Sequence, residues 1–359
     1  MPISAVDTIS LAFQHTRRQL FQPFRFGQWA RLALVGLLAG EMGGGNFNLP
    51  SNFNIPKDTN SSHQFLSTPF PHIDPAILGT VIAIAIIAGL IFMVVMTYIS
   101  SVMRFILFDS VLTKQCHIRQ GWSRRQDPGW KFFLWQIGFM LVMLLAMSVF
   151  IGLPALYAYT HGWFSAPDRH VMGLILGGIA MFCVVVVFCI AVAVVHVFTK
   201  DFVVPQMALE GIDAIEGWRR LWPMVQAEKS GYVIYALMKI VLAIGAGIAI
   251  GIVSVILGLI IAVPVIGAII AAAAAGGPGF SWNVFTITAA IVGGCILFAL
   301  FFFLVALITV PAIVFFPAYS MYFFAPRYRA LSLALYPPAP GAVMGAPPPD
   351  LPPAPQPAF

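Results

Sequence analysis

Long apolar runs alternate with short polar segments along this chain. A helix needs about 20 consecutive apolar residues to cross the hydrocarbon core of a membrane. Five runs exceed that length, and one shorter run near the N-terminus comes close to it. The pattern therefore predicts an all-α, polytopic transmembrane helical bundle with about six spans, placed at 27–45, 75–103, 132–160, 171–198, 232–263 and 284–316.

The first of these spans is the weakest. Arg31 lies near one end of 27–45 and Glu41 near the other, so only the middle of the segment is free of charge. The aliphatic part of an arginine can lie along an apolar helix while its charge reaches the interface, which lowers the cost of Arg31. We expect Glu41 at the outer end of this span.

The apolar stretch 232–275 is too long for one crossing. As a straight helix it would measure about 66 Å, roughly twice the thickness of the hydrocarbon core. Pro264 lacks an amide hydrogen and is expected to break or kink the helix. We therefore predict one tilted span at 232–263, followed at 265–275 by a short helix that is either interfacial or re-entrant.

The segment 1–26 has an amphipathic pattern. Apolar residues recur on one face at helical spacing, with basic residues close by. This favours a helix that lies in the membrane interface, and a solvated leader helix is the alternative. The residues of the apolar face are Val6, Ile9, Phe13 and Leu20.

The C-terminal segment 336–359 differs from the six-span domain at 27–335. Ten prolines occur in residues 337–359. A Pro-rich composition is typical of disorder or of polyproline II helix. Such a tail either docks a protein partner or remains bare, and the sequence leaves both alternatives open.

Composition supports the membrane interpretation. The 359 residues are 60% hydrophobic and 9% charged, whereas soluble domains average about 45–50% and 25%. A soluble protein could not bury that much apolar surface. Ordinary soluble enzymes, disulfide scaffolds and disordered chains are therefore excluded.

The basic residues predict the orientation. Seventeen of the nineteen Lys and Arg residues lie near the N-terminus, in 104–131, in 200–239, or at 327 and 329. Cytoplasmic loops carry an excess of Lys and Arg. We expect a multi-pass protein of the cell (cytoplasmic or inner) membrane with both termini in the cytoplasm.

A short pattern recurs before three of the spans. Gly-Trp followed two residues later by Arg occurs at Trp122 and again at Trp218, and a looser copy surrounds Trp29. The spacings of 93 and 96 residues are consistent with a repeated helical hairpin, although chance similarity is an alternative.

Tryptophan and arginine also suit the membrane surface. Indole rings lie at the headgroup level, and arginine binds lipid phosphate. We therefore predict contact with anionic lipid at the cytoplasmic face and no binding of nucleic acid. The candidate lipid-interface residues are Trp29, Arg31, Trp122, Arg124, Trp218 and Arg220.

The sequence contains no recognisable catalytic pattern. The interiors of the five long spans carry no acidic residue, and the four cysteines form no CxxC pair. His196 lies alone near the end of a span, where a structural role is the more common one. No catalytic, cofactor-binding or metal-binding residue is predicted, and the protein is not expected to be an enzyme.

Two segments resemble known membrane families. They begin at Arg17 (RRQLFQPFRFGQWARLA) and at Asp213 (DAIEGWRRLW). They look like uncharacterised prokaryotic six-span membrane proteins, which are similar to the membrane domain of some glycerophosphoryl diester phosphodiesterases. The resemblance implies a prokaryotic membrane protein. It does not imply the phosphodiesterase activity, because the catalytic barrel is absent from this chain.

Two functional classes follow from these patterns. The first is a non-catalytic membrane adaptor or lipid-organising component, which fits the Trp and Arg pattern and the acid-free spans. The alternative is a transporter or channel for an uncharged or amphiphilic solute, which would need no buried charge. A continuous polar pathway through the bundle would favour the second class.

Overall fold

A computed structural model of the chain describes residues 4–41, 75–163, 171–275 and 284–336, which are helical with no strand. The predicted all-α fold is confirmed. The Pro-rich tail lies outside the described residues. The α-helices are α1 (Asp7–Phe21), α2 (Phe26–Leu38), α3 (Pro75–Thr113), α4 (Ile118–Thr160), α5 (Val171–Phe198), α6 (Val204–Glu210), α7 (Ala214–Ala227), α8 (Lys229–Ala275), α9 (Val284–Phe324) and α10 (Arg329–Leu335).

Five helices of the described chain are long and apolar enough to cross a membrane. They are α3, α4, α5 with its continuation, α8 and α9, which correspond to the five long predicted spans. The protein is therefore a multi-pass membrane protein.

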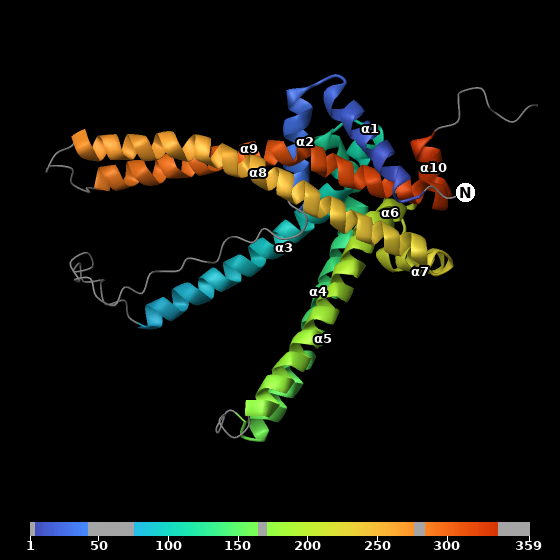
Figure 1. Cartoon of the computed structure of the whole chain (residues 1–359), viewed down its shortest axis with the longest axis horizontal. Coiled ribbons are helices and arrows are strands. Elements are labelled where there is room, and N and C mark those ends of the chain that lie inside the picture. The colour runs from blue at the N-terminus through green and yellow to red at the C-terminus, as the bar shows by residue number, and fades with distance from the viewer. Residues whose placement is uncertain (1–3, 42–74, 164–170, 276–283, 337–359) are drawn as a thin grey trace, which may run out of the picture.

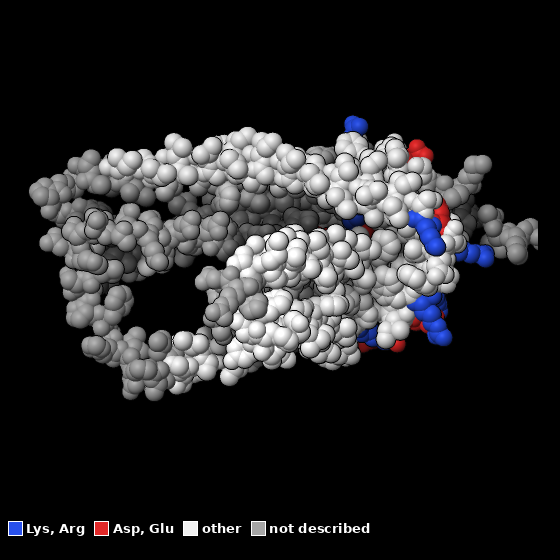
Figure 2. Space-filling model, turned by 60° about the horizontal axis from the view of Figure 1, so that its bottom comes forward, with Lys and Arg blue, Asp and Glu red and all other residues white. Residues whose placement is uncertain are grey.

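The molecule has a compact end from which three arms extend (Figure 1). We call the compact end the hub; it contains α1, α2, α6, α7, α10 and the adjoining ends of the long helices. The arms are α3 alone, the α4–α5 hairpin and the α8–α9 hairpin. Their side chains are largely exposed and apolar, which suits contact with lipid. Figure 2 shows that the charged side chains gather at the hub end while the arms carry almost none.

Aromatic rings form the centre of the hub. Phe202 lies 5.1 Å from Tyr235 between ring centroids, and Tyr235 lies 4.5 Å from Phe323. Each such pair contributes about 0.5–1.5 kcal/mol beyond its buried area. At the edge of this cluster Arg327 donates two hydrogen bonds to Glu228, at 2.7 and 2.8 Å. The hub, and not the arms, therefore holds the protein core.

Two long helices, α3 and α4, continue well beyond their predicted spans into the hub. α3 extends to Thr113 and α4 already begins at Ile118. Arg125 joins these two extensions through a two-pronged contact with Asp109, with both nitrogen–oxygen distances at 2.6 Å. Asp109 and Arg125, which the apolar pattern assigned to a loop, are thus helical and neutralise each other across the two helices.

The helix described within the predicted first span is shorter than the prediction. α2 has 13 residues, which gives about 20 Å, too short for the hydrocarbon core. Just beyond its end, Glu41 pairs with Lys200 inside the hub instead of lying at an outer membrane surface. A buried carboxylate needs a partner, and the hub supplies one. Residues 42–45 of the predicted span lie outside the described residues.

The prediction at Pro264 is also corrected. α8 runs unbroken through Pro264, so 265–275 continues the same helix and is not a separate one. A proline removes only one backbone hydrogen bond, whereas leaving the helix in an apolar medium would expose several. The greater cost of a break therefore favours one long helix.

The predicted apolar face of α1 is divided between the hub and its surroundings. Leu20 is buried and Ile9 is half-buried against the hub, together with the polar residues His15, Thr16 and Gln19, while Val6 and Phe13 are exposed. Gln19 donates to the carbonyl of Ser110, so polar side chains of α1 satisfy backbone groups of α3. The outward apolar residues are consistent with an interfacial helix.

Candidate functional site

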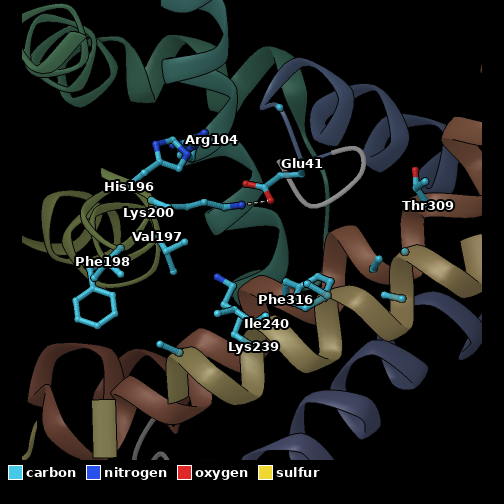
Figure 3. Close-up of a pocket in the computed structure, with 18 of the residues that line it drawn as sticks. Glu41, Arg104, His196, Val197, Phe198, Lys200, Lys239, Ile240, Thr309 and Phe316 are labelled. Atoms are coloured by element: carbon cyan, nitrogen blue, oxygen red, sulfur yellow. Dashed lines mark hydrogen bonds and ion pairs between the residues drawn. The ribbon is translucent and has the colours of Figure 1, made fainter. Parts of the chain in front are cut away.

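A cavity of about 650 Å³ lies at the membrane side of the hub, between α5 and α8 (Figure 3). These helices belong to different arms, which diverge from this point (Figure 1). From the helical rise, the lining extends about 15 Å along α5 and its continuation, from Ile190 to Lys200, and about 21 Å along α8, from Ala236 to Ile250. The apolar side chains of the lining are Ile190, Ala193, Val194, Val197 and Phe198 from α5, Ala236, Ile240, Ala243, Ala246 and Ile250 from α8, and Ala312 and Phe316 from α9, and Gly247 of α8 also lines it.

The hub end of the cavity is charged. Lys200 donates to Glu41, whose side chain is only 6% exposed. Lys239 pairs with Asp201, whose side chain is only 3% exposed. The carboxylate of Asp201 also accepts a hydrogen bond of 2.9 Å from the hydroxyl of Tyr235. Both ion pairs are thus fixed in place by the hub.

Arg104 of α3 supplies a further cation to the cavity. It is 8% exposed. Its Nη2 donates to the carbonyl of Ala39 at 3.2 Å, and the guanidinium lies 5.5 Å from the ring centroid of Phe132. Its Nε has no hydrogen-bond partner within the described structure, and the guanidinium forms no ion pair there. Arg104 therefore retains unused donor capacity beside the cavity.

The local backbone explains how two adjacent residues reach different partners. Thr199–Val203 forms a π-helical turn between α5 and α6. Such turns add a residue to the helical repeat and often occur at functional sites. Here Lys200 is directed to Glu41 and Asp201 to Lys239.

The charges around Glu41 control its ionisation. Burial alone would raise the pKa of this carboxyl, but the positive charges of Lys200 and Arg104 outweigh it and lower the pKa below its usual value. Glu41 is therefore ionised at neutral pH. Its Oε1 nevertheless has no hydrogen-bond partner within the described structure.

The predicted lipid-interface residues lie elsewhere in the hub. Trp29, Trp122 and Trp218 are half-buried against the core. Trp29 donates to the carbonyl of Leu20, and Trp218 to the hydroxyl of Thr199. The three tryptophans thus have similar packing roles, and none of them lines the cavity.

The predicted arginines are exposed at the hub surface. Arg220 pairs with Glu210 and Glu216, while Arg31 lies beside a shallow surface pocket formed with residues 117–120. Arg124 is also exposed. Their contact with lipid stays a prediction.

The charged residues of the cavity were not predicted as a site. Arg104 and Lys200 fall at the ends of predicted spans, Lys239 falls inside the predicted span 232–263, and Glu41 was assigned to the opposite surface. One signal was present: each is the first charge beside a long apolar run. That signal cannot show which edges meet, so only the tertiary structure brings them together. His196, treated as structural, also lines the cavity.

One family model matches residues 3–334, with the description "Family of unknown function (DUF7544)". The chain belongs to this family. The DUF7544 match includes every residue that lines the cavity. No curated protein and no solved structure matches the chain. Because the description of DUF7544 names no activity or relative, the similarity to phosphodiesterase membrane domains stays a prediction.

Proposed function

We propose that the protein is a non-catalytic, lipid-organising component of the membrane that holds an amphiphilic lipid in the cavity between α5 and α8. The cavity is the observation that carries this proposal. It joins a charged end at the hub to largely apolar walls about 15–21 Å long. A membrane lipid has the same arrangement, a polar headgroup joined to apolar chains.

The position of the cavity supports this function. Its walls belong to apolar helices that diverge, so a lipid can enter sideways from the bilayer (Figure 1). Its volume of about 650 Å³ lies within the usual range for small-molecule sites. The hub keeps the charged groups at one end, where a headgroup would lie.

A pair of matched variants tests the proposal. Ala246 lines the cavity, whereas Ala249 on the same helix is exposed outside it. A phenylalanine at position 246 would fill the cavity, so we expect Ala246→Phe to lower lipid occupancy about tenfold. Native mass spectrometry of protein released from native lipid discs would measure the retained lipid. We expect Ala249→Phe to retain as much lipid as the unchanged protein.

Two results would overturn the lipid-binding function. One is a protein released without any bound lipid. The other is equal retention by Ala246→Phe and Ala249→Phe, which would place the lipid outside the cavity.

The same cavity also favours a second function, movement of an amphiphilic solute across the membrane. A binding place at one membrane face is what such a transporter needs for loading. Lipid scrambling in proteoliposomes separates the two functions, because a lipid-organising component leaves the rate at that of empty liposomes. An adaptor role through the Pro-rich tail concerns residues outside the described structure and stays a prediction.

A further inference from the structure

The formal charges at the hub end of the cavity do not balance. Arg104, Lys200 and Lys239 carry three positive charges, and Glu41 and Asp201 carry two negative charges. The two lysines each have a carboxylate partner. Arg104 forms no ion pair with any described residue, so the excess positive charge lies on its guanidinium.

An unpaired buried cation is costly unless an anion joins it. The guanidinium of arginine matches phosphate oxygens in geometry and can donate two parallel hydrogen bonds to them. Arg104 lines the cavity, and its Nε is buried without a partner, so a small rotation of the guanidinium would present free donors to a phosphate group in the cavity. One excess positive charge corresponds to one phosphodiester.

A second unused group defines the rest of the headgroup. Oε1 of Glu41 is buried without a hydrogen-bond partner, so it needs a donor. An ammonium or a hydroxyl would serve. An ammonium would cancel the charge of the phosphodiester and leave Arg104 unbalanced, whereas a hydroxyl adds no charge.

We propose that the cavity selects an anionic phospholipid with a hydroxylated headgroup, whose phosphodiester contacts Arg104 and whose hydroxyl donates to Glu41. Phosphatidylglycerol is the simplest lipid with this chemistry. The apolar walls would then hold the upper part of its acyl chains. This inference rests on the proposed lipid-binding function and adds the identity of the headgroup.

Headgroup competition tests the inference. The protein is placed in lipid discs that contain equal amounts of phosphatidylglycerol, phosphatidylethanolamine and phosphatidylcholine with the same acyl chains. Native mass spectrometry then measures which lipid is retained. We expect the unchanged protein to favour phosphatidylglycerol by about tenfold, the size of one or two charge-assisted hydrogen bonds.

Three variants assign the preference to the cavity. Arg104→Gln removes the excess charge, so the preference should fall to parity while lipid is still retained. Glu41→Gln raises the formal charge by one, so the preference for the anionic lipid should persist or increase. Arg329→Gln loses the same charge as Arg104→Gln but at an exposed hub position that is not among the predicted lipid-interface residues, and should leave the preference unchanged. Loss of the preference in Arg104→Gln together with a kept or increased preference in Glu41→Gln cannot arise from misfolding alone.

Soluble glycerol phosphate distinguishes a lipid from a free phosphate. We expect phosphatidylglycerol to raise the melting temperature in detergent and millimolar glycerol phosphate to leave it unchanged. Stabilisation by glycerol phosphate alone would show a soluble-phosphate site and overturn the lipid assignment. Retention of lipid without headgroup preference, or a preference that survives Arg104→Gln, would overturn this inference while leaving lipid binding intact. Release without any lipid would overturn both.

Discussion

His15 has one tautomer defined by its neighbours. Its Nε2 lies 3.0 Å from the carbonyl of Val111, which can only accept, so Nε2 carries the proton. Its Nδ1, at 3.1 Å, then accepts a hydrogen bond from the hydroxyl of Tyr322. Burial lowers the pKa of this imidazole. The hydrogen bond to Val111 acts in the opposite direction and raises the pKa, while the nearby positive charge of Lys114 lowers it further, so the pKa lies below its usual value. His15 thus joins α1 to α3 and α9 in its neutral form.

The lowered pKa predicts how stability depends on pH. The folded protein binds the His15 proton less readily than the unfolded chain, whose value is near 6.5. The contribution of His15 to the stability of the folded protein is therefore fully present above pH 6.5 and is lost as the pH falls toward the pKa of His15 in the folded protein. We expect the melting temperature of the unchanged protein to drop more between pH 7.5 and 5.5 than that of His15→Gln. Parallel melting curves would contradict a buried neutral imidazole.

Other residues at this scale show the limit of sequence reasoning. Arg31 and Arg104 are both arginines beside apolar runs. Arg31 is exposed at the hub surface, whereas Arg104 is buried beside the cavity. The difference comes from neighbours that are distant in sequence, so no local pattern could separate them.

At the scale of elements, α2 packs closely against α9 through a glycine. A Cβ added to Gly36 would lie 2.5–2.9 Å from three side-chain atoms of Ile313. Only a residue without a side chain permits this approach. The short helix α2 is therefore a closely fitted part of the hub.

This contact yields a matched pair of variants. Gly36→Ala forces Ile313 to move, so we expect a loss of about 1–3 kcal/mol of stability. Gly27 lies on the same helix, and a Cβ added to it would have no atom within 4 Å. Because alanine favours a helix more than glycine does, we expect Gly27→Ala to raise stability by less than about 1 kcal/mol. Thermal unfolding in detergent measures both.

A double variant checks the cause of the loss. Because Ile313→Ala removes the clashing atoms, the cost of Gly36→Ala should be smaller in that background than in the unchanged protein. Equal costs in the two backgrounds would show that Ile313 is not the obstacle.

The long elements were predictable and their ends were not. Apolar run length located all five spanning helices, since crossing a membrane imposes a length on the sequence. The run lengths could not show that α3 continues to Thr113 or that α8 passes Pro264. Helix ends depend on neighbours such as the Arg125–Asp109 pair, which the local pattern does not contain.

At the scale of the whole molecule, the hub gathers most of the basic residues. Both described ends of the chain, in α1 and α10, lie there as well (Figure 1). Because Lys and Arg are retained on the cytoplasmic side during insertion, we expect the hub to face the cytoplasm.

Accessibility labelling tests this orientation. Cysteine is introduced singly at exposed positions of a variant that lacks the four native cysteines: Gln14 and Gln126 in the hub, and His161 at the far end of α4. An impermeant thiol reagent should label Gln14→Cys and Gln126→Cys only from the cytoplasmic side, and His161→Cys only from the outside. Labelling of Gln14→Cys and Gln126→Cys from opposite sides would mean that the hub is not one compact unit.

Membrane insertion, the five spanning helices and the concentration of positive charge at one end followed from composition and run length. These properties depend on whether lipid or water surrounds each segment, and the local amino-acid composition is enough to predict that. Only the tertiary structure decided that α2 is short and that α8 is unbroken. It also decided which charged residues meet at one cavity, namely Glu41, Arg104, Lys200 and Lys239. Charges that lie far apart in the chain lower the free-energy cost of burying one another only after the helices have packed. A local sequence pattern therefore cannot predict which of them become partners.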